Sequence, residues 1–428
     1  MIDIRQVREA PDTLREALRR RGRRDADEVV ATLANLDAKR RTILQDVEQR
    51  KSERNRASEE VAQRKKRGAD AAPLIAELKD LSDSIKTKDQ ALRDVDATLR
   101  ERLLWIPNIP LPDVPEGDAS ANRLERSWGE PPRFSFAPRP HWDLGQALGI
   151  LDLARGAKLS GSGFPLFRGA GSRLIRALLQ FMLDLHTREH GYEEVSTPYL
   201  VTGETAQGTG QLPAFADEMY TTRDGLYLVP TAEVPVTNIH RDEILAADEL
   251  PKGYTAYTPC FRREAGAHGK DTRGLIRVHQ FDKVELVRFT RPEASAAELE
   301  TLTRHAEAVL QRLEIPYRVV TLATGDMGFA SAKTYDLEVW AAGVGAWLEV
   351  SSASTFTDFQ ARRANIRYRP AADAKPEYVH TLNASGVAFP RTLIALLENN
   401  QAEDGSVRIP EALVPYLGVD RLTPRGTP

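Results

Sequence analysis

A stretch of the chain without proline or glycine, residues 27–67, constrains the fold more than any other feature of the sequence. Within it, apolar residues recur at alternating steps of three and four positions, the heptad pattern of helices that pair side by side. The apolar seam positions are Leu33, Leu36, Ile43, Val47, Ala57 and Val61, and basic residues interrupt the seam at Arg40, Arg50 and Arg54. The pattern predicts a long helix that pairs with another helix.

The partner is expected directly after a short turn. Gly68 ends the first helix and Pro73 suits the first turn of the next. The seam of the second helix reads Leu74, Leu78, Leu81, Ile85, Lys88, Leu92, Val95 and Leu99. Because the turn is short, the helices must run antiparallel, and they would extend about 60 Å and about 45 Å. We therefore expect residues 1–105 to form a helical domain whose coiled coil, about 27–102, projects as an arm.

Lysine and arginine residues crowd the first helix and the turn, where they can follow a phosphate backbone. The solvated face of a coiled coil would carry the same charges, so the arm alone supports either interpretation. The candidate RNA contacts are Arg40, Arg50, Arg54, Arg64, Lys65 and Lys66.

Prolines mark the end of the arm. After Trp105 the sequence reads PNIPLPDVPEG, so residues 106–140 are interpreted as a linker and the start of a body whose main part is 141–428. There, residues 164–190 have helical periodicity, and short runs of alternating character follow, among them YTAYTPCFRRE and IRVHQFDKVELVRF. Such alternation suits antiparallel strands. The predicted class is α+β, with an antiparallel sheet flanked by helices in addition to the coiled-coil arm.

Composition excludes several classes of protein. Hydrophobic residues make up 41% of the 428 residues, and no apolar run is long enough to span a bilayer. The N-terminus MIDIRQVREA is unlike a secretory signal, so we expect a cytoplasmic protein without a membrane partner. Cys260 is the only cysteine, which excludes an internal disulfide and a zinc site built on several thiolates. We expect no zinc, and a catalytic metal would rely mainly on oxygen ligands.

The common phosphate-loop, dinucleotide, zinc-protease and hydrolase signatures are absent from the sequence. Instead, residues 261–264 (FRRE) lead through a glycine-rich loop, 265–274, into residues 276–285 (IRVHQFDKVE). This strand, loop, strand arrangement resembles motif 2 of the class II aminoacyl-tRNA synthetases, whose loop reaches toward the acceptor end of the RNA.

Two further stretches resemble the other motifs of that class, in the correct order. The helix before Gly191 and the strand that ends at Pro198 are similar to motif 1, the usual dimer contact. Residues 383–386 (NASG), followed by residues 389–391 (FPR) and a helix, are similar to motif 3. The class II fold is therefore the expected architecture of the body.

Shorter stretches resemble the seryl-tRNA synthetase family in particular. They are GTGQLP at 208–213, TAE at 231–233, HQFDKVE at 279–285, EVSS at 349–352 and FTDFQARR at 356–363. The resemblance implies an enzyme that activates serine with ATP to seryl-adenylate and transfers it to the 3′-terminal ribose of tRNA(Ser). It also implies a homodimer, Mg²⁺ acting with ATP and an arm that holds the RNA, and it makes tRNA(Sec) a second candidate substrate.

The resemblance assigns roles to individual residues. Arg262, Arg391 and Glu349 are the expected catalytic residues, because fixed cations stabilise the charge that develops when a carboxylate attacks the α-phosphate. Glu349 and Ser352 are expected to hold Mg²⁺. The expected ATP contacts are Arg262, Arg263, Glu264, Val278, Phe281, Glu349, Val350, Ser351, Ser352 and Arg391, and the expected serine contacts are Thr231, Ala232, Glu233, Glu285 and Ser385.

Two other functions stay open on the sequence. One is an enzyme of the same fold that attaches a small amino acid to an acceptor other than tRNA, and the other is an RNA-binding homologue without catalysis. The basic arm argues against the first, and the full set of expected catalytic residues argues against the second. Arg263, Ala353, Thr355 and Pro390 depart from the common text of the family. Pro390 suits a first helical turn and is expected to leave Arg391 in place.

Overall fold

The structure, a computed structural model, describes residues 1–265 and 273–424. The chain divides into two compact units, one of Ile2–Ile106 and one of Met1 with Pro107–Pro428. The first unit is helical, and the second is built on a large sheet.

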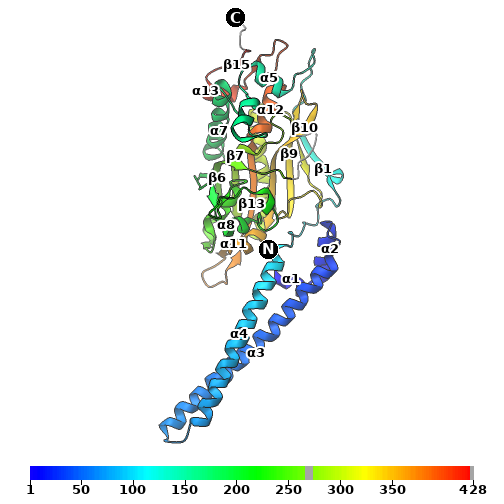
Figure 1. Cartoon of the computed structure of the whole chain (residues 1–428). Coiled ribbons are helices and arrows are strands. Elements are labelled where there is room, and N and C mark those ends of the chain that lie inside the picture. The colour runs from blue at the N-terminus through cyan, green and yellow to red at the C-terminus, as the bar shows by residue number, and fades with distance from the viewer. Residues whose placement is uncertain (266–272, 425–428) are drawn as a thin grey trace. The chain divides into compact units, whose positions relative to one another are not determined.

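The first unit consists of the helices α1 (Ile4–Glu9), α2 (Pro11–Arg20), α3 (Ala26–Lys66) and α4 (Ala72–Leu104) (Figure 1). Pro73 lies in the first turn of α4, as predicted. Part of the apolar seam is buried, namely Leu33, Val47 and Val61 in α3 and Ile85, Val95 and Leu99 in α4. The predicted long antiparallel hairpin is confirmed.

Ion pairs join α3 to α4 where the seam is polar. Arg40 Nε lies 2.5 Å from Asp96 Oδ1, and Lys51 Nζ lies 3.0 Å from Asp89 Oδ1. Such partly exposed pairs add little stability. Because each charge must meet its partner on the other helix, they favour one register of the hairpin over the alternatives.

A large sheet organises the described part of the second unit, with the strand order β1-β8-β9-β10-β13-β7-β6-β2. Neighbouring strands pair antiparallel, except for the parallel pair of β2 and β6. The strands are β1 (Arg123–Trp128), β8 (Tyr317–Thr321), β9 (Lys333–Ala341), β10 (Ala346–Thr357), β13 (His380–Ala388), β7 (Gln280–Thr290), β6 (Lys252–Phe261) and β2 (Glu193–Glu194). The predicted antiparallel sheet is confirmed. Its edge strand β1 comes from the stretch 106–140 that was interpreted as a linker.

Helices and smaller sheets surround the large sheet (Figure 1). The α-helices are α5 (His141–Ala147), α6 (Leu153–Ser160), α7 (Ala170–Arg188), α8 (Gly203–Thr209), α9 (Glu233–Thr237), α10 (Ser295–Arg312), α11 (Phe359–Ala364), α12 (Phe389–Asn399) and α13 (Val414–Leu417). The smaller sheets pair β11 (Arg367–Arg369) with β5 (Ile244–Ala246) and β12 (Glu377–Tyr378), β3 (Leu200–Val201) with β4 (Tyr227–Leu228), and β14 (Val407–Arg408) with β15 (Arg421–Leu422).

The helix predicted over residues 164–190 starts later than its periodicity suggests. Residues before α7 are extended instead, since Phe167 forms an isolated β-bridge with Leu151. Gly169 then precedes the helix with a φ of 52°, a conformation that glycine adopts at little cost. The predicted N-terminal boundary was therefore wrong.

The two faces of the large sheet carry different residues, because successive side chains of a strand point to opposite sides. In β13, Leu382 and Ala384 belong to the hydrophobic core, whereas Asn383 and Ser385 line a cavity. The same core contains side chains of α7, α10 and α12, such as Leu178, Leu302 and Leu393. Helices therefore cover one face of the sheet and leave polar residues of the other face for a site.

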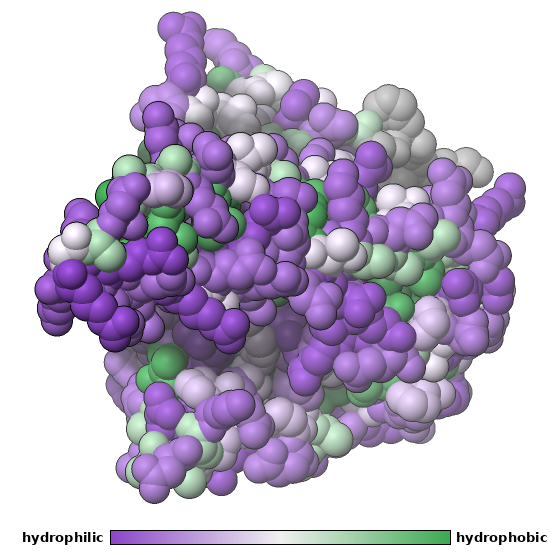
Figure 2. Space-filling view, turned by 90° about the horizontal axis from the view of Figure 1, so that it is seen from below, coloured by the Kyte–Doolittle hydropathy of each residue, from purple (hydrophilic) through white to green (hydrophobic). Residues whose placement is uncertain are grey.

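The surface seen in Figure 2 is mostly hydrophilic, with small hydrophobic patches scattered between charged residues. Within residues 1–265 and 273–424, no helix combines the length and the apolar character that crossing a membrane requires.

Candidate active site

A cavity of about 610 Å³ lies over the polar face of the sheet. Its walls come from the strands β7, β9, β10 and β13 and from loops that precede α9 and follow β6. Lining residues with polar side chains include Thr231, Glu233, Arg262, Glu264, Lys283, Asp336, Glu349, Ser352, Asn383 and Ser385. Charged side chains of both signs therefore meet in one cavity.

A second cavity, of about 230 Å³, adjoins the first. Arg262, Glu264, Lys283, Glu349 and Ser385 line both cavities, and the second also has walls from Arg277, Val278, Phe281, Val350 and Arg391. The shared residues mark a junction at which two ligands can meet. We call the larger space the acyl cavity and the smaller one the nucleotide cavity, after the substrates that the sequence resemblance implies for their lining residues.

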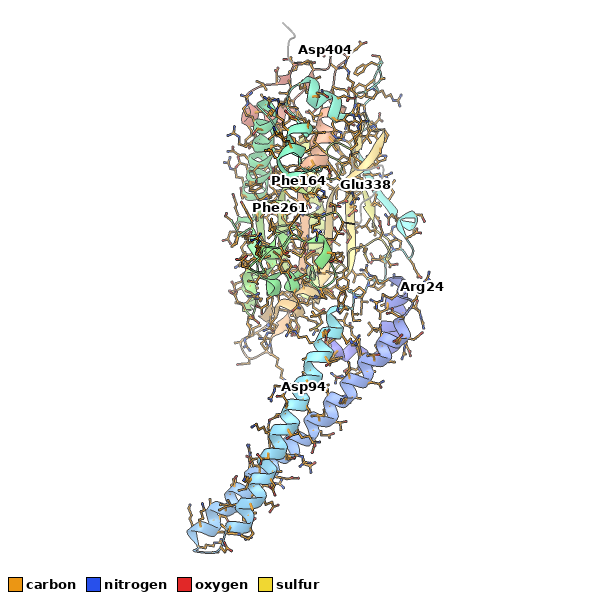
Figure 3. All side chains as sticks on the ribbon, in the orientation of Figure 1. Arg24, Asp94, Phe164, Phe261, Glu338 and Asp404 are labelled. Carbon is orange, nitrogen blue, oxygen red and sulfur yellow. The ribbon has the colours of Figure 1, made fainter. Side chains whose placement is uncertain are left out.

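Arg262 follows directly on Phe261, the last residue of β6 (Figure 3). Its Nε donates to the carbonyl oxygen of Pro230 at 3.3 Å, and its guanidinium lies 5.2 Å from the ring centre of Phe281. The backbone amide of Arg262 donates to the carbonyl oxygen of His279 at 2.9 Å, which continues the β6–β7 ladder past the end of the strand. The strand pair thus fixes the backbone of Arg262, and the bond to Pro230 fixes its guanidinium at the junction.

Arg391 reaches the same junction from the first turn of α12. Its Nη1 donates to the carbonyl oxygen of Glu349 at 2.8 Å and to Glu349 Oε2 at 3.1 Å, and its Nε donates to the carbonyl oxygen of Ile276 at 3.1 Å. Pro390 occupies the start of the helix and leaves Arg391 in place, as expected. Bonds to β10 and to the loop before β7 fix the orientation of this guanidinium.

Glu349 and Ser352 lie close together in β10, where Ser352 Oγ donates to Glu349 Oε1 at 3.2 Å. Desolvation raises the pKa of a carboxyl group, but the charges of Arg391 and Arg262 outweigh it and lower the pKa of Glu349. Across the strand pair, Asp336 of β9 faces Ser352 and lines the acyl cavity. Burial raises the pKa of Asp336, and its Oδ1 has no hydrogen-bond partner among the described residues.

This donor set suits Mg²⁺, which prefers oxygen ligands and usually keeps places for phosphate oxygens and water. Glu349 and Ser352 offer a carboxylate and a hydroxyl, and the orphaned oxygen of Asp336 adds a third group near them. Within the described parts of the chain, no group of three or more His, Cys, Asp or Glu residues is arranged to hold a metal ion.

A buried network lies at the base of the acyl cavity. Lys283 Nζ lies 2.6 Å from Glu285 Oε2 and donates to Thr231 Oγ1 at 2.8 Å. Thr231 Oγ1 in turn donates to Glu285 Oε2 at 3.2 Å, and Asn383 Nδ2 donates to Glu285 Oε1 at 2.9 Å. Both oxygens of this buried carboxylate therefore have donors. Ser385 of β13 stands opposite Glu285 of β7, and Asn383 lies two residues before Ser385 on the same face of β13. Asn383 can therefore reach the carboxylate of Glu285 across the strand pair.

Glu233 is the second buried carboxyl group of the site. Gln360 Nε2 donates to Glu233 Oε1 at 2.5 Å, while Thr381 Oγ1 donates to Gln360 Oε1 at 2.7 Å. Burial, with the charge of nearby Glu285, raises the pKa of Glu233 to about 7. The group therefore changes its charge near neutral pH.

Comparisons with known proteins agree with this geometry. Residues 1–110 match the seryl-tRNA synthetase N-terminal domain, and residues 217–400 match the tRNA synthetase class II core domain (G, H, P, S and T). The serine–tRNA ligase of Gemmatimonas aurantiaca is 58% identical over 420 residues, which are 98% of this chain and 99% of that protein. The chain belongs to the seryl-tRNA synthetase family.

Solved structures support the same assignment. A crystal structure of seryl-tRNA synthetase from Pyrococcus horikoshii complexed with ATP matches with a TM-score of 0.93 at 39% identity, covering 99% of this chain and 100% of that chain. The cytoplasmic serine–tRNA ligase of Naegleria fowleri in complex with AMP matches with a TM-score of 0.87 at 31% identity, covering 100% and 99%. The class II fold of the seryl-tRNA synthetase family is thus shown over the full length of the chain.

Most of the residues that the family resemblance suggested lie around the two cavities. Four do not line either cavity: Arg263 is exposed, Ala232 is fully buried, Ser351 Oγ donates to the carbonyl oxygen of Ser385 at 2.6 Å, and Glu285 is the fourth. Glu285 also lies behind the wall, since it is 1% exposed and is reached only through its neighbours. A direct contact of Ser351 with a nucleotide would need the backbone rather than the side chain, because its hydroxyl is buried and bonded to β13.

Three residues of the site were not proposed from the sequence, namely Lys283, Asn383 and Asp336. Lys283 and Glu285 are two apart in β7 and thus share a face, and this spacing could have drawn attention to Lys283. Asn383 was quoted only as part of motif 3. Asp336 gave no signal, because an aspartate within a strand is more often a solvated residue.

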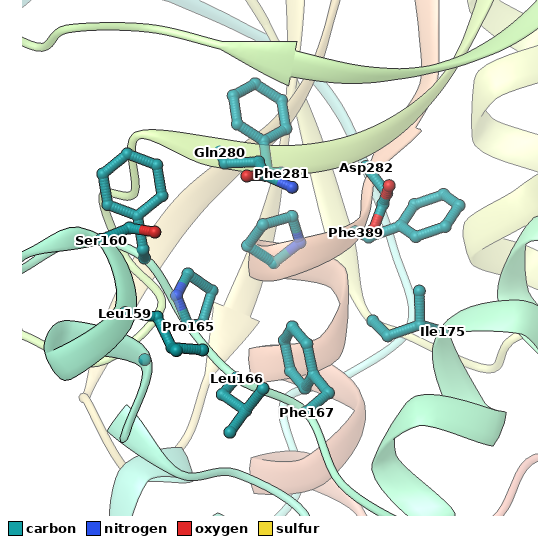
Figure 4. A pocket seen from close by; sticks show the side chains of 13 residues that line it. Leu159, Ser160, Pro165, Leu166, Phe167, Ile175, Gln280, Phe281, Asp282 and Phe389 are labelled. Carbon is teal, nitrogen blue, oxygen red and sulfur yellow. The ribbon is translucent and has the colours of Figure 1, made fainter. Parts of the chain in front are cut away.

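Phe281 separates the nucleotide cavity from a third cavity of about 240 Å³. Figure 4 shows this third cavity, with Phe281 and Asp282 of β7 at one side and apolar side chains such as Phe167 and Ile175 around it. Phe281 therefore lies in the wall that these two cavities share.

The candidate RNA contacts in the arm fall into two groups. Arg40, Arg50 and Arg64 already pair with carboxylates of the arm. Arg54, Lys65 and Lys66 have no ion pair with a described residue; the two lysines are exposed and Arg54 is partly buried. The second group is thus more readily available to a phosphate backbone.

Proposed function

We propose that this chain attaches serine to tRNA(Ser) in two steps at the expense of ATP, in the acyl and nucleotide cavities described above. The observation that carries the proposal is the meeting of Arg262, Arg391 and Glu349, which are far apart in the sequence, around one cavity. Family membership supplies the chemical identity of the reaction, and the geometry suits it.

ATP would lie in the nucleotide cavity, with its adenine against Phe281 and near Glu264 and Val278. Glu264 Oε2 accepts from Arg277 Nη1 at 2.5 Å, so this carboxylate is held in place before a ligand arrives. The guanidinium groups of Arg262 and Arg391 would bind the phosphates, where a planar fork donates paired hydrogen bonds that a lysine cannot reproduce.

In the first step an oxygen of the serine carboxylate attacks the α-phosphorus, and the bond from phosphorus to the pyrophosphate oxygen breaks. Negative charge accumulates on the α-phosphate during the attack, and fixed cations stabilise it. No general base is needed, because the carboxylate is already ionised. Cys260 is fully buried and burial raises the pKa of its thiol, so no nucleophilic role is proposed for it.

Glu349 and Ser352 would hold Mg²⁺ between the protein and the phosphates of ATP. Bound there, the ion would neutralise charge on the phosphates and on the departing pyrophosphate. The side chains of the protein provide the oxygen ligands and position them through the bond from Ser352 to Glu349.

Serine would enter the acyl cavity, with its ammonium group near Thr231, Glu233 and Glu285 and its hydroxyl near Ser385. A cavity with buried polar groups rejects alanine, because those groups would stay unpaired without a hydroxyl. Ala232 and Val350 would shape the backbone of the site rather than contact the substrate through polar atoms.

In the second step the terminal ribose hydroxyl of the tRNA attacks the carbonyl carbon of seryl-adenylate, and AMP leaves. The arm would hold the RNA through phosphates, with Lys65 and Lys66 as the most accessible cations and Arg54 further along α3. The family also serves tRNA(Sec), which we propose as a second substrate. We further propose a homodimer in the cytoplasm, where its tRNA and ATP are found.

Exchange of labelled pyrophosphate into ATP tests the first step, with serine, threonine, alanine and glycine compared side by side. We expect exchange with serine and much slower exchange with the others. No exchange with any amino acid would support the non-catalytic homologue, and exchange without subsequent charging of tRNA(Ser) would support an enzyme with another acceptor.

A further inference from the structure

Lys283 covers the carboxylate that is proposed to receive the substrate's ammonium group. Glu285 does not line the acyl cavity, whereas Lys283 and Thr231 do. Oε2 of Glu285 forms an ion pair with Lys283 and accepts a hydrogen bond from Thr231, and Oε1 accepts a hydrogen bond from Asn383. Lys283 is thus one of three side chains, with Thr231 and Asn383, that stand between the cavity and the oxygens of Glu285, and it is the only cation among these three.

Two cations cannot share this position at low cost. The Lys283 ammonium lies 2.6 Å from Glu285 Oε2, and a substrate ammonium on the same oxygen would stand about as close. Like charges at such separation repel strongly where water is excluded. Lys283 and Glu285 are 5% and 1% exposed, so solvent does not screen them. A substrate ammonium on Oε2 therefore requires Lys283 to move away from this oxygen.

The structure also offers a place for the displaced ammonium. Lys283 lines the nucleotide cavity as well as the acyl cavity, together with Arg262 and Glu349. With ATP and serine bound, the phosphates and the serine carboxylate bring negative charge to this junction. A lysine has four rotatable side-chain bonds and a compact charge, which suits movement between two anionic partners.

We propose that Lys283 is a displaceable counter-ion, which neutralises Glu285 in the empty site and moves toward the nucleotide cavity when the substrate's ammonium group takes its place. The inference rests on the proposed function of the two cavities. It makes Lys283 a specificity residue for substrates that carry an α-ammonium group, because only a cation can replace it on Glu285. It also gives the reaction a third positive charge at the junction once serine is bound.

The alternative is a fixed Lys283 that only positions Glu285 and Thr231. The two ideas differ in what Lys283→Met does to serine binding. A fixed positioning residue is needed for binding, so its loss would weaken binding and turnover together. A displaced counter-ion competes with the substrate, so its loss would spare binding and slow the chemical step.

The experiment measures the Kd of serine without ATP by calorimetry, and the kcat of serine-dependent pyrophosphate exchange, for wild type and Lys283→Met. Both measurements are made at the same pH, near 8. We expect a Kd no more than about threefold weaker than that of wild type, with kcat lowered by at least about tenfold, as for other cations at a transition state. A Kd weakened by more than threefold, or an unchanged kcat, would overturn the proposal.

Lys283→Arg provides a second test if the methionine variant does not fold. A guanidinium would hold Glu285 through two bonds and leave it less readily, so serine binding should weaken more than threefold although the charge is kept. Binding equal to that of wild type would contradict displacement. Lys252→Met is the matched control, since Lys252 pairs with Glu249 at the opposite end of the β6–β7 pair and lines neither cavity. Failure of wild type to exchange with serine would reject the proposed function instead.

Discussion

Arg391 Nη1 lies 2.8 Å from the carbonyl oxygen of Glu349 and 3.1 Å from its carboxylate oxygen Oε2. This contact joins the start of α12 to β10 before any ligand is present. The cation that would bind phosphate and the anion that would bind metal are thus placed together by the fold. Such preorganisation lowers the cost of arranging charges during the reaction.

Replacing Arg391 should slow activation far more than it weakens the fold. We expect Arg391→Ala to lower kcat for pyrophosphate exchange by about 10²–10³-fold, the usual loss for one stabilising donor at a transition state. Arg391→Lys should recover little of this, because lysine cannot donate the paired bonds. Arg408→Ala is the control, as Arg408 is a partly exposed arginine paired with Glu314 and lines neither cavity. Equal rates in Arg391→Lys and wild type would contradict the role.

The activity with serine should depend on pH through Glu233, whose pKa is raised to about 7 by burial and by Glu285. The carboxyl group is neutral below this value and anionic above it, and the anion attracts the ammonium group of serine. We therefore expect kcat/KM for serine to rise between roughly pH 6 and pH 8, since this ratio reports the free enzyme. Glu233→Gln should remove the rise, and an unchanged pH profile in that variant would count against the assignment.

The same group affects stability with the opposite sign. Because the pKa of Glu233 is raised from 4.5 in the folded chain, the folded state binds this proton more tightly than the unfolded state. Its contribution to the free energy of unfolding therefore falls as the pH rises from about 4.5 to about 7. Urea unfolding of wild type and Glu233→Gln at several pH values measures the difference.

Removing the hairpin should separate the two steps. We expect a chain in which a short flexible linker replaces residues 27–99 to retain pyrophosphate exchange and to lose charging of tRNA(Ser), because the phosphate contacts would reside in the arm. Circular dichroism should confirm that the remainder is folded. Equal loss of both activities in a folded variant would show that the arm is needed for the catalytic cavities.

Cations of the arm should differ in their effects. Substituting Lys65 and Lys66 by glutamine should weaken RNA binding for all sequences and reduce the slope of log K against log salt by about 0.7–0.9 for each phosphate that the arm no longer neutralises. Arg40→Gln removes the partner of Asp96, and because such a partly exposed pair adds little stability, it should change the thermal stability of the arm only slightly. Salt titrations of tRNA binding check the first effect, and thermal unfolding of the full chain checks the second.

Gly386 should not tolerate a side chain. A Cβ atom there would lie 2.7 Å from Nε2 of the buried His186, and neighbouring backbone leaves little room for adjustment. We expect Gly386→Ala to lower the free energy of unfolding by about 1–3 kcal/mol, the usual cost of overpacking. Gly203→Ala is the control, because a Cβ at Gly203 would make an ordinary contact of 3.4 Å with Tyr227. Similar stability of the two variants would contradict the crowding.

Much of the architecture follows from local pattern. The heptad seam of residues 27–67 predicted α3 because a long repeat leaves few alternatives to a paired helix. Alternation in residues 276–289 (IRVHQFDKVELVRF) predicted β7 in the same way. The start of α7 was not predicted, because the backbone at Phe167 is held extended by a bridge to Leu151.

The site could be predicted only in part. Arg262, Glu349 and Arg391 were found through motif resemblance, since no periodicity brings such distant residues together. The network around Glu285 was not predicted, because it depends on the register that places Asn383 and Lys283 around one carboxylate. A lysine in a strand ordinarily suggests solvent, and only the fold shows that Lys283 is buried.

A crystal structure with a stable sulfamoyl analogue of seryl-adenylate tests the central claim most directly. We predict adenine against Phe281, the phosphate surrogate within hydrogen-bond distance of Arg262, the seryl group in the acyl cavity, and Arg391 beside the space left by pyrophosphate. An analogue bound elsewhere, or a bound analogue that leaves Arg262 turned away from the phosphate surrogate, would contradict the account.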